Sequence, residues 1–330
     1  MKLYDVTLRD GNHALRHSLD PKFVAAYCKL ADESDSWAIE VGHGNGLGAS
    51  SYLVGKSKFA DEKILSAARE NLKNKLLAVH SIPGFATIED DLKPAIDLGV
   101  DVFRVATHVT EASVGEKHIE FLATQDKIVH GVLMMSHMTS IENLIRQVQL
   151  MINYGAQAVI LMDSAGFFTP MHVESKVKIL REELGTTLGF HAHNNLGVAI
   201  SNAITALSFG VEILDGASMG LGAGAGNAQL ELLIANLKRN DETEKFELNK
   251  YLALSELVER EQKDFLPRIT SSSIESGYNG VFSGYAPQVS QISEETGISR
   301  SELWKAMAER NLVAGQESMI REIANDLMNL

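Results

Sequence analysis

The segment Tyr4-Asp-Val-Thr-Leu-Arg-Asp-Gly-Asn-His-Ala14 joins a short strand pattern to an unusual concentration of polar chemistry. Its first five residues alternate apolar and polar side chains, which is the period-two pattern of a β-strand. Where this strand should end, the chain places Arg9, Asp10 and His13 around a glycine. The segment is therefore either part of a functional site or an ordinary strand end whose aspartate caps the next helix, and the rest of the chain must distinguish the two.

The strand-then-helix unit repeats over about 240 residues. After the first strand, period-two or apolar patterns predict strands at 37–41, 76–82, 102–107, 128–135, 158–162, 187–193 and 211–217. Helical patterns lie between them, at 62–71, 90–98, 115–125, 141–154, 170–184 and 198–209. This alternation is typical of an α/β protein with a (β/α)₈ TIM barrel, and a doubly wound open sheet is the competing architecture.

The pattern changes to helices without strands after about residue 240. Residues 252–265, 289–297, 301–310 and 317–327 fit a 3.6-residue period. The serine- and glycine-rich stretch 271–285, which contains Tyr278, is predicted to be a loop. We therefore expect a catalytic barrel of residues 1–262, followed by a small C-terminal helical domain of residues 263–330 that contributes to the barrel mouth and to partner contacts.

Composition excludes several classes of function. The 330 residues carry a formal net charge of −13, which argues against a nucleic-acid partner or an anionic membrane surface because either needs a basic patch. The chain has one cysteine, Cys28, and its N-terminus resembles no signal peptide. No apolar run approaches the roughly 18 residues of a membrane span. We expect a soluble cytoplasmic protein.

In a TIM barrel, catalytic groups lie at the C-terminal ends of the strands or in the loops just after them. Polar residues gather at these predicted ends, and they include seven of the eleven histidines. The set comprises Arg9, Asp10, His13, His43, His80, Ser81, Thr107, His108, Ser136, His137, Asp163, Ser164, His191, His193, Asn194 and Ser218. Such clustering predicts an active site at this end of the barrel.

His191-Ala192-His193 predicts a metal site. Period-two geometry points both imidazoles to the same side of the seventh strand. The first and seventh strands are separated only by the eighth in a closed barrel, so Asp10 is a reasonable third ligand. Two histidines and one carboxylate with open positions suit Mn²⁺, Fe²⁺, Co²⁺, Zn²⁺ or Mg²⁺ acting as a Lewis acid.

Three other sites fit the sequence less well. An amidohydrolase barrel carries its His-x-His on the first strand, whereas here it is on the seventh. A Schiff-base aldolase needs a desolvated strand lysine, and residues 158–163 contain none. The glycine-rich run 220–227 follows the last strand instead of opening the chain, so it favours a cradle for a substrate anion over a dinucleotide turn. In that case Asn227 would cap the next helix.

Several motifs together carry a resemblance that spans nearly the whole chain. They are residues 7–14 (TLRDGNHA), 104–108 (RVATH), 134–138 (MMSHM), 162–166 (MDSAG), 191–196 (HAHNNL), 222–228 (GAGAGNA) and 277–281 (GYNGV). In these motifs the chain resembles the 4-hydroxy-2-oxovalerate aldolases, which are class II pyruvate aldolases of the hydroxymethylglutaryl-CoA lyase-like superfamily.

The resemblance implies a divalent-metal-dependent aldolase. The metal, usually Mn²⁺ with Mg²⁺, Co²⁺ or Zn²⁺ as alternatives, would be held by Asp10, His191 and His193. A 4-hydroxy-2-oxoacid would be cleaved to pyruvate and an aldehyde, or formed from them, through a metal-stabilised pyruvate enolate. His191 would also lie against the substrate. Asn227 is an extra ligand or a neighbour of the ligands in this reading.

The resemblance also implies roles for other polar residues. His13 would take the proton from the C4 hydroxyl as general base, and Arg9 would stabilise the enolate. Tyr278 would reach the barrel mouth and position the substrate hydroxyl or the aldehyde. Ser164 would help to hold the substrate carboxylate.

One stretch departs from the family. Family members carry a leucine-rich run before Pro-Gly on the third strand, where this chain has His80 and Ser81. These residues would line the aldehyde pocket, so they indicate a more polar or differently sized aldehyde. The remaining histidines His43, His108 and His137 are interpreted as packed or supporting residues.

Two further interpretations stay open. The chain could be an acyl-CoA lyase or synthase of the same superfamily. It could also act mainly as an aldolase-like subunit of an acylating aldehyde dehydrogenase, because the enzymes it resembles pass their aldehyde to such a partner. A homo-oligomer or a hetero-oligomer is expected in either case.

Overall fold

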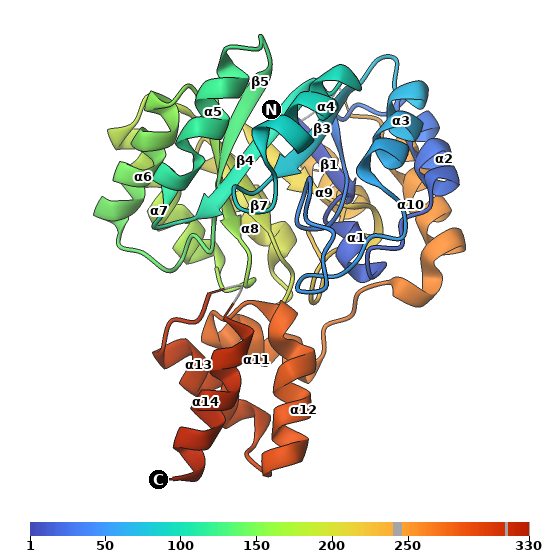
Figure 1. The fold of residues 1–330 in the computed structure, drawn as a ribbon. Coiled ribbons are helices and arrows are strands. Elements are labelled where there is room, and N and C mark those ends of the chain that lie inside the picture. The colour runs from blue at the N-terminus through green and yellow to red at the C-terminus, as the bar shows by residue number, and fades with distance from the viewer. Residues whose placement is uncertain (240–245, 314–315, 330) are drawn as a thin grey trace.

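The computed structural model describes residues 1–239, 246–313 and 316–329. Eight parallel strands close into a barrel in the order β1 to β8, and β1 pairs with both β2 and β8. Helices surround the strands (Figure 1). The predicted TIM barrel is therefore confirmed, and the open-sheet alternative is wrong.

The elements follow the predicted alternation. The strands are β1 (Lys2–Leu8), β2 (Ala38–Val41), β3 (Leu76–Ser81), β4 (Val102–His108), β5 (Ile128–Met134), β6 (Ala158–Asp163), β7 (Thr187–Ala192) and β8 (Ile213–Gly216). The helices of the barrel region are α1 (Gly11–Ala14), α2 (Pro21–Ala31), α3 (Asp61–Asn71), α4 (Lys93–Asp97), α5 (Glu116–Ala123), α6 (Ile141–Asn153), α7 (Pro170–Glu183), α8 (Ala199–Ser208), α9 (Leu230–Arg239) and α10 (Leu248–Gln262).

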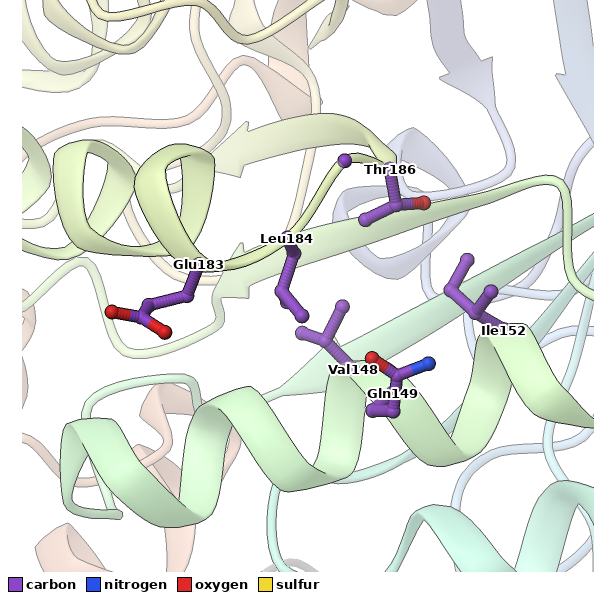
Figure 2. A pocket seen from close by; sticks show the side chains of 7 residues that line it. Val148, Gln149, Ile152, Glu183, Leu184 and Thr186 are labelled. Carbon is purple, nitrogen blue, oxygen red and sulfur yellow. The ribbon is translucent and has the colours of Figure 1, made fainter.

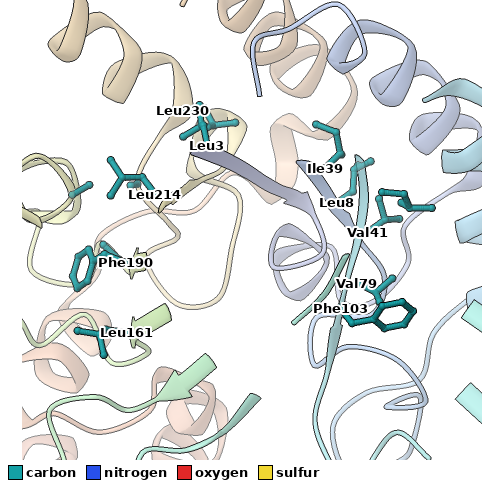
Figure 3. Close-up of a cluster of buried hydrophobic side chains, with 14 of the residues drawn as sticks. Leu3, Leu8, Ile39, Val41, Val79, Phe103, Leu161, Phe190, Leu214 and Leu230 are labelled. Atoms are coloured by element: carbon teal, nitrogen blue, oxygen red, sulfur yellow. The ribbon is translucent and has the colours of Figure 1, made fainter. Parts of the chain in front are cut away.

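Alternation along the strands divides the apolar residues between two layers. On β3, Leu77 and Val79 belong to the main core between strands and helices, part of which Figure 3 shows. Ala78 belongs to a separate apolar cluster inside the barrel. Since successive side chains point to opposite faces, His80 points into the barrel and Ser81 points towards the helices.

A buried hydrogen-bond cluster fastens β1 to α2 and to the segment after β8. The Asp5 carboxylate accepts hydrogen bonds from the Thr7 hydroxyl (2.5 Å) and the Tyr27 hydroxyl (2.7 Å). Tyr27 Oη also lies 2.6 Å from Ser218 Oγ. Burial raises the pKa of Asp5 to about 6, although these hydrogen bonds oppose the shift.

The raised pKa of Asp5 predicts a pH-dependent stability. The folded chain holds the Asp5 proton more tightly than an unfolded chain, whose carboxyl has a pKa of about 3.9. This stabilisation is complete below pH 4 and is lost as pH rises through about 6. Raising the pH from 5 to 7.5 should remove about 1.4 kcal/mol of unfolding free energy, which Asp5→Asn should not lose. Urea unfolding of both proteins at the two pH values measures the difference, and parallel pH profiles would contradict it.

The C-terminal region forms a second small core at one end of the barrel (Figure 1). It contains α11 (Ser271–Asn279), α12 (Ala286–Thr296), α13 (Arg300–Glu309) and α14 (Glu317–Met328). Its core includes Trp304 and Ile320, whereas α10 contributes Val258 to the barrel core. The boundary after residue 262 remains a prediction. Within the described ranges, no helix is long and apolar enough to cross a membrane.

The prediction of a loop at 271–285 is wrong over most of its length. Residues 271–279 form α11, and 283–285 form a short 3₁₀ turn. Thr270 and Ser273 make a capping box at the start of α11, and Gly280 ends it in a left-handed conformation with φ of 67°. Serine lowers helix propensity only modestly, so the caps and the packing against the barrel outweigh the serine-rich composition.

Candidate active site and metal centre

Asp10, His191 and His193 lie together, buried, at the C-terminal end of the barrel. One ligand atom from each residue lies within 4.8 Å of the other two. His191 Nε2 and both ring nitrogens of His193 are buried without a hydrogen-bond partner in the described part of the chain. Unsatisfied buried imidazole nitrogens are costly, and a divalent cation would use one nitrogen from each ring. The donor set, two nitrogens and one carboxylate, fits a Lewis-acidic metal.

The carboxylate of Asp10 is held in its ionised form by its neighbours. It accepts hydrogen bonds from Arg9 Nη1 (2.7 Å), Asn227 Nδ2 (2.8 Å) and the Ala223 backbone amide (3.3 Å). Burial alone would raise the pKa of Asp10, but the Arg9 guanidinium and the nearby histidines hold it well below its usual range. Asn227 therefore contacts a predicted metal ligand directly. The prediction that Asn227 caps the next helix is wrong, because α9 begins at Leu230.

Arg9 has one free donor beside this carboxylate. Its Nε donates to Glu40 Oε2 (2.8 Å), and its Nη1 donates to Asp10 and to the Gly44 carbonyl (3.3 Å). Its Nη2 is buried and has no hydrogen-bond partner among the described residues. A rigid guanidinium with a spare N–H is suited to bind an oxyanion.

His13 lies close to the same glycine. A Cβ atom at Gly44 would come within 2.6 Å of three atoms of the His13 ring, so a side chain larger than hydrogen would displace the imidazole. Burial lowers the pKa of His13, and Asp10 partly opposes this. The imidazole is therefore neutral at pH 7 and able to accept a proton.

A buried charge network, which the sequence interpretation did not include, lies beneath these residues inside the barrel. Arg104 on β4 places Nη2 2.6 Å from Asp215 Oδ2 and Nη1 3.3 Å from Glu40 Oε2. Glu40 reaches Arg9, and Asp215 lies 2.9 Å from His191 Nδ1. The sequence does contain a sign of this network, which is Arg104 within the apolar fourth strand. A charged residue inside an apolar strand almost always needs a buried partner.

Asp215 fixes the orientation of a predicted metal ligand. Its carboxylate engages His191 Nδ1, which leaves Nε2 directed at the cluster, the arrangement typical of metal-binding histidines. Asp215→Asn should weaken Mn²⁺ binding by about 10- to 100-fold, measured by calorimetric titration, with activity recovering at high Mn²⁺. Glu212→Gln is a matched control, because Glu212 forms a solvent-exposed ion pair with Arg181. Unchanged Mn²⁺ affinity in Asp215→Asn would rule out the orienting role.

The two residues predicted to line an aldehyde pocket are separated by the pleat of β3. His80 is buried inside the barrel, and its Nδ1 lies 3.6 Å from Glu40 Oε1. Burial lowers the pKa of His80 to about 4, so the ring is neutral at pH 7. Ser81 is also buried but belongs to the helix-facing side. The structure therefore brings His80, and not Ser81, towards the predicted site.

Ser164 and Tyr278 differ in how far they are buried. Ser164, just after β6, is buried, and its Oγ accepts a hydrogen bond from the Met135 amide (3.1 Å). Tyr278 on α11 is 76% exposed, and its side chain makes no hydrogen bond to another residue of the described chain. The structure thus does not bring the Tyr278 side chain into contact with the cluster.

The supporting histidines have identifiable contacts. His137 Nε2 lies 2.8 Å from the Gly280 carbonyl and its ring stacks on Phe167, so it joins the barrel to the helical region. His108 Nδ1 lies 2.8 Å from Thr110 Oγ1 within its own loop. Cys28 is buried on α2. These positions agree with packing roles.

A surface hollow of about 260 Å³ lies away from this site. It is bounded by α6 and by the connection from α7 to β7, with Val148, Ile152 and Leu184 among its lining residues (Figure 2). That connection precedes β7, so the hollow is at the N-terminal end of the strands, opposite the cluster. No predicted site residue lines it.

Comparison with known proteins shows the family to which this chain belongs. Residues 1–258 match the HMGL-like family, and residues 267–329 match the DmpG-like communication domain. The chain is 46% identical over 323 residues to the 4-hydroxy-2-oxovalerate aldolase of Spirochaeta aurantia, covering 98% of this chain and 95% of that protein. It is 45% identical over 325 residues to the protein of the same name from Pectobacterium atrosepticum, with the same coverage.

A solved structure supports the fold alone. The carboxyl transferase domain of Rhizobium etli pyruvate carboxylase superposes with a TM-score of 0.82 at 16% identity, over 100% of this chain and 60% of that chain. The sequence relatives are close enough, over nearly their full length, to establish kinship. The chain therefore belongs to the HMGL-like proteins and, among them, to the 4-hydroxy-2-oxovalerate aldolase family, which makes it a lyase of the aldolase type.

Proposed function

We propose that this chain interconverts a 4-hydroxy-2-oxoacid with pyruvate and an aldehyde, using a divalent metal held by Asp10, His191 and His193. One observation carries the proposal. The three ligand atoms and the free Nη2 of Arg9 are buried at the barrel mouth, and the half-buried ring of His13 is close enough to Asp10 to interact with it electrostatically. The names of the relatives point to the same substrate class.

A metal in this position would act as a Lewis acid on the oxygens of the 2-oxoacid. We propose Mn²⁺, with Mg²⁺, Co²⁺ or Zn²⁺ as alternatives. The residues provide the site themselves: the Arg9 guanidinium keeps Asp10 ionised, and Asp215 holds the ring of His191. Chelation should remove activity, and adding back each metal in turn would show which ion supports it best.

The chemistry needs one base and one anion-binding donor. A ring nitrogen of His13 takes the proton of the C4 hydroxyl, and the C4 oxygen forms the aldehyde carbonyl as the C3–C4 bond breaks. The electron pair of that bond passes to C3 and the adjacent carbonyl, giving the pyruvate enolate. The N–H of Arg9 Nη2 donates to the enolate oxygen. Return of the proton to C3 completes pyruvate.

Two other residues are proposed to position the substrate. Ser164 Oγ accepts from Met135, so its own hydroxyl proton is free to donate to a substrate carboxylate. Tyr278 is proposed to approach the substrate hydroxyl or the aldehyde. A contact of α11 supports this role of Tyr278. Asn195 Nδ2 donates to Ser276 Oγ (3.3 Å) and so holds the helix against the barrel loops.

The aldehyde is proposed to be more polar than acetaldehyde. His80 supports this, because a neutral imidazole inside the barrel can donate to or accept from a polar aldehyde substituent. A pyruvate-coupled screen of 4-hydroxy-2-oxoacids with apolar and hydroxylated side chains tests it. We expect the highest kcat/KM for a hydroxylated side chain, and His80→Leu should shift the preference towards apolar ones.

Proton exchange tests the enolate chemistry directly. With Mn²⁺ and pyruvate in D₂O, the protein should exchange the C3 protons of pyruvate, observed by NMR, and His13→Asn should not. Absence of C3 proton exchange in the wild-type protein would contradict the enolate step. Turnover of a CoA ester in place of 4-hydroxy-2-oxoacids would instead support the acyl-CoA lyase or synthase reading.

The helical region is proposed to bind an acylating aldehyde dehydrogenase that receives the aldehyde. The match of residues 267–329 to a communication domain supports this. Co-purification with such an enzyme, and a faster coupled reaction than with the separate proteins, are the expected results. The single, buried cysteine fits a reducing compartment, so the cytoplasm is the proposed location.

A further inference from the structure

Three histidine rings form a continuous stack at the barrel mouth. The ring of His17 meets His13 edge-on, with centroids 5.2 Å apart and an interplanar angle of 73°. On its other side His17 lies flat against His43, with centroids 3.7 Å apart and an angle of 6°. We call His13, His17 and His43 the histidine stack. His17 and His43 have no part in the reaction as proposed above.

His43 is fixed by both of its ring nitrogens. Its Nδ1 accepts a hydrogen bond from the Asn45 amide (3.0 Å), and its Nε2 lies 3.0 Å from the Gly55 carbonyl, to which it can only donate. One accepting and one donating nitrogen define a neutral imidazole. Burial agrees with this by lowering the pKa of His43 to about 4. His43 therefore joins the stack to the turn formed by residues 51–55.

His17 is held in an unfavourable backbone conformation. Arg16 and His17 have φ values of 51° and 58°, in the left-handed region that residues other than glycine seldom occupy. The His17 carbonyl accepts from the Lys58 amide (2.9 Å). A Cβ atom at Gly55 would lie 2.3 Å from His17 Cδ2, so the backbone of the 51–55 turn touches the ring. Such strain persists only where the surrounding contacts enforce it.

The imidazole of His13, the proposed general base, is confined by two contacts, which we call its walls. Gly44 closes one side of the His13 ring, and the edge-on contact with His17 closes another. Without the second wall the His13 side chain could adopt other rotamers. Misplacing a catalytic group by about 1 Å can cost 10²-fold in rate, so the second wall matters for turnover even though it touches no substrate.

We propose that His17 and His43 are positioning residues, which hold the His13 imidazole in its reactive place and couple it to the 51–55 turn. The inference rests on the proposed role of His13 as the base. The ring of His17 is needed for its shape and flatness and not for its titration. A flat apolar ring should therefore replace it.

Two substitutions of His17 separate shape from folding. Asn tolerates the left-handed backbone and removes the ring, whereas Phe keeps a flat ring. His17→Asn should lower kcat by about 10- to 100-fold with KM changed less than about twofold. His17→Phe, which keeps a flat ring, should retain most of the wild-type kcat. Tyr27→Phe is the control for general destabilisation. It loses buried hydrogen bonds between α2 and β1 and should keep the wild-type kcat.

Hydrogen exchange gives a readout that does not depend on activity. The Ser51 amide donates to the Gly55 carbonyl (3.1 Å), and the Lys58 amide donates to His17. Peptides covering 51–58 should exchange faster in His17→Asn and at the wild-type rate in His17→Phe. Unchanged exchange in His17→Asn would overturn the coupling even if the wild-type protein proved not to be an aldolase. Equal kcat in His17→Asn and wild type, or equal damage in both variants, would overturn the positioning role.

Discussion

Asp10→Asn is expected to lower kcat/KM by about 10³-fold, the effect of losing several kcal/mol of charge stabilisation. The wild-type carboxylate accepts from Arg9, Asn227 and the Ala223 amide at the same time. An asparagine has one carbonyl oxygen, so its NH₂ group must face one of these donors. The variant therefore loses the negative ligand and also gains a repulsive contact between two N–H groups.

Metal binding and catalysis should fail together in Asp10→Asn. Equilibrium dialysis against Mn²⁺ would measure the first, and a pyruvate-coupled assay the second. Asp5→Asn is a matched control, because Asp5 is on the same chain segment but hydrogen-bonds to Thr7 and Tyr27 and not to the cluster residues. Its Mn²⁺ affinity and kcat should equal those of the wild type. Full Mn²⁺ binding by Asp10→Asn would exclude the carboxylate as a ligand.

Arg9→Lys should lower kcat by about 10²- to 10³-fold, as the loss of one preorganised oxyanion donor does. Arginine uses Nε for Glu40 and Nη1 for Asp10, and still keeps Nη2 free. A lysine has a single ammonium group, and the two carboxylates would capture it between them. The positive charge is kept, but the donor aimed at the substrate is lost.

The Arg9→Lys variant should keep much of its Mn²⁺ affinity, which separates it from Asp10→Asn. Arg69→Lys is the control, because Arg69 is half-exposed and pairs with Asp101 (2.9 Å) on the outside of the barrel. It should have wild-type kcat. If Arg9→Lys retained wild-type kcat, a point charge would suffice, and the directional hydrogen bond proposed for Nη2 would be wrong.

The part of the site that alternation and strand order can predict lies as expected. His191 and His193 are two residues apart at the end of one strand, and Asp10 follows a strand only two positions away around the barrel. Such relations depend on the fold class and on the period of a strand. The barrel itself was predictable for the same reason.

Other features depend on pairings that no local pattern specifies. Arg104 meets Glu40 and Asp215 only because β4, β2 and β8 face one another across the barrel interior. Ser81 was grouped with His80 by sequence proximity, although the pleat sends the two side chains to opposite faces. The helix α11 was missed because its serines favour turns, and its contacts with the barrel are tertiary.

The buried charge network also has a charge balance. Together with Asp10 it contains three carboxylates, on Asp10, Glu40 and Asp215, against two guanidiniums, on Arg9 and Arg104. Counted alone, these five groups have an excess of one negative charge, and a divalent cation would reverse it to an excess of one positive charge. A ligand with a single carboxylate would then restore neutrality. The barrel interior is thus matched in charge to a dication and a monocarboxylate together, which favours binding of the cation before the acid.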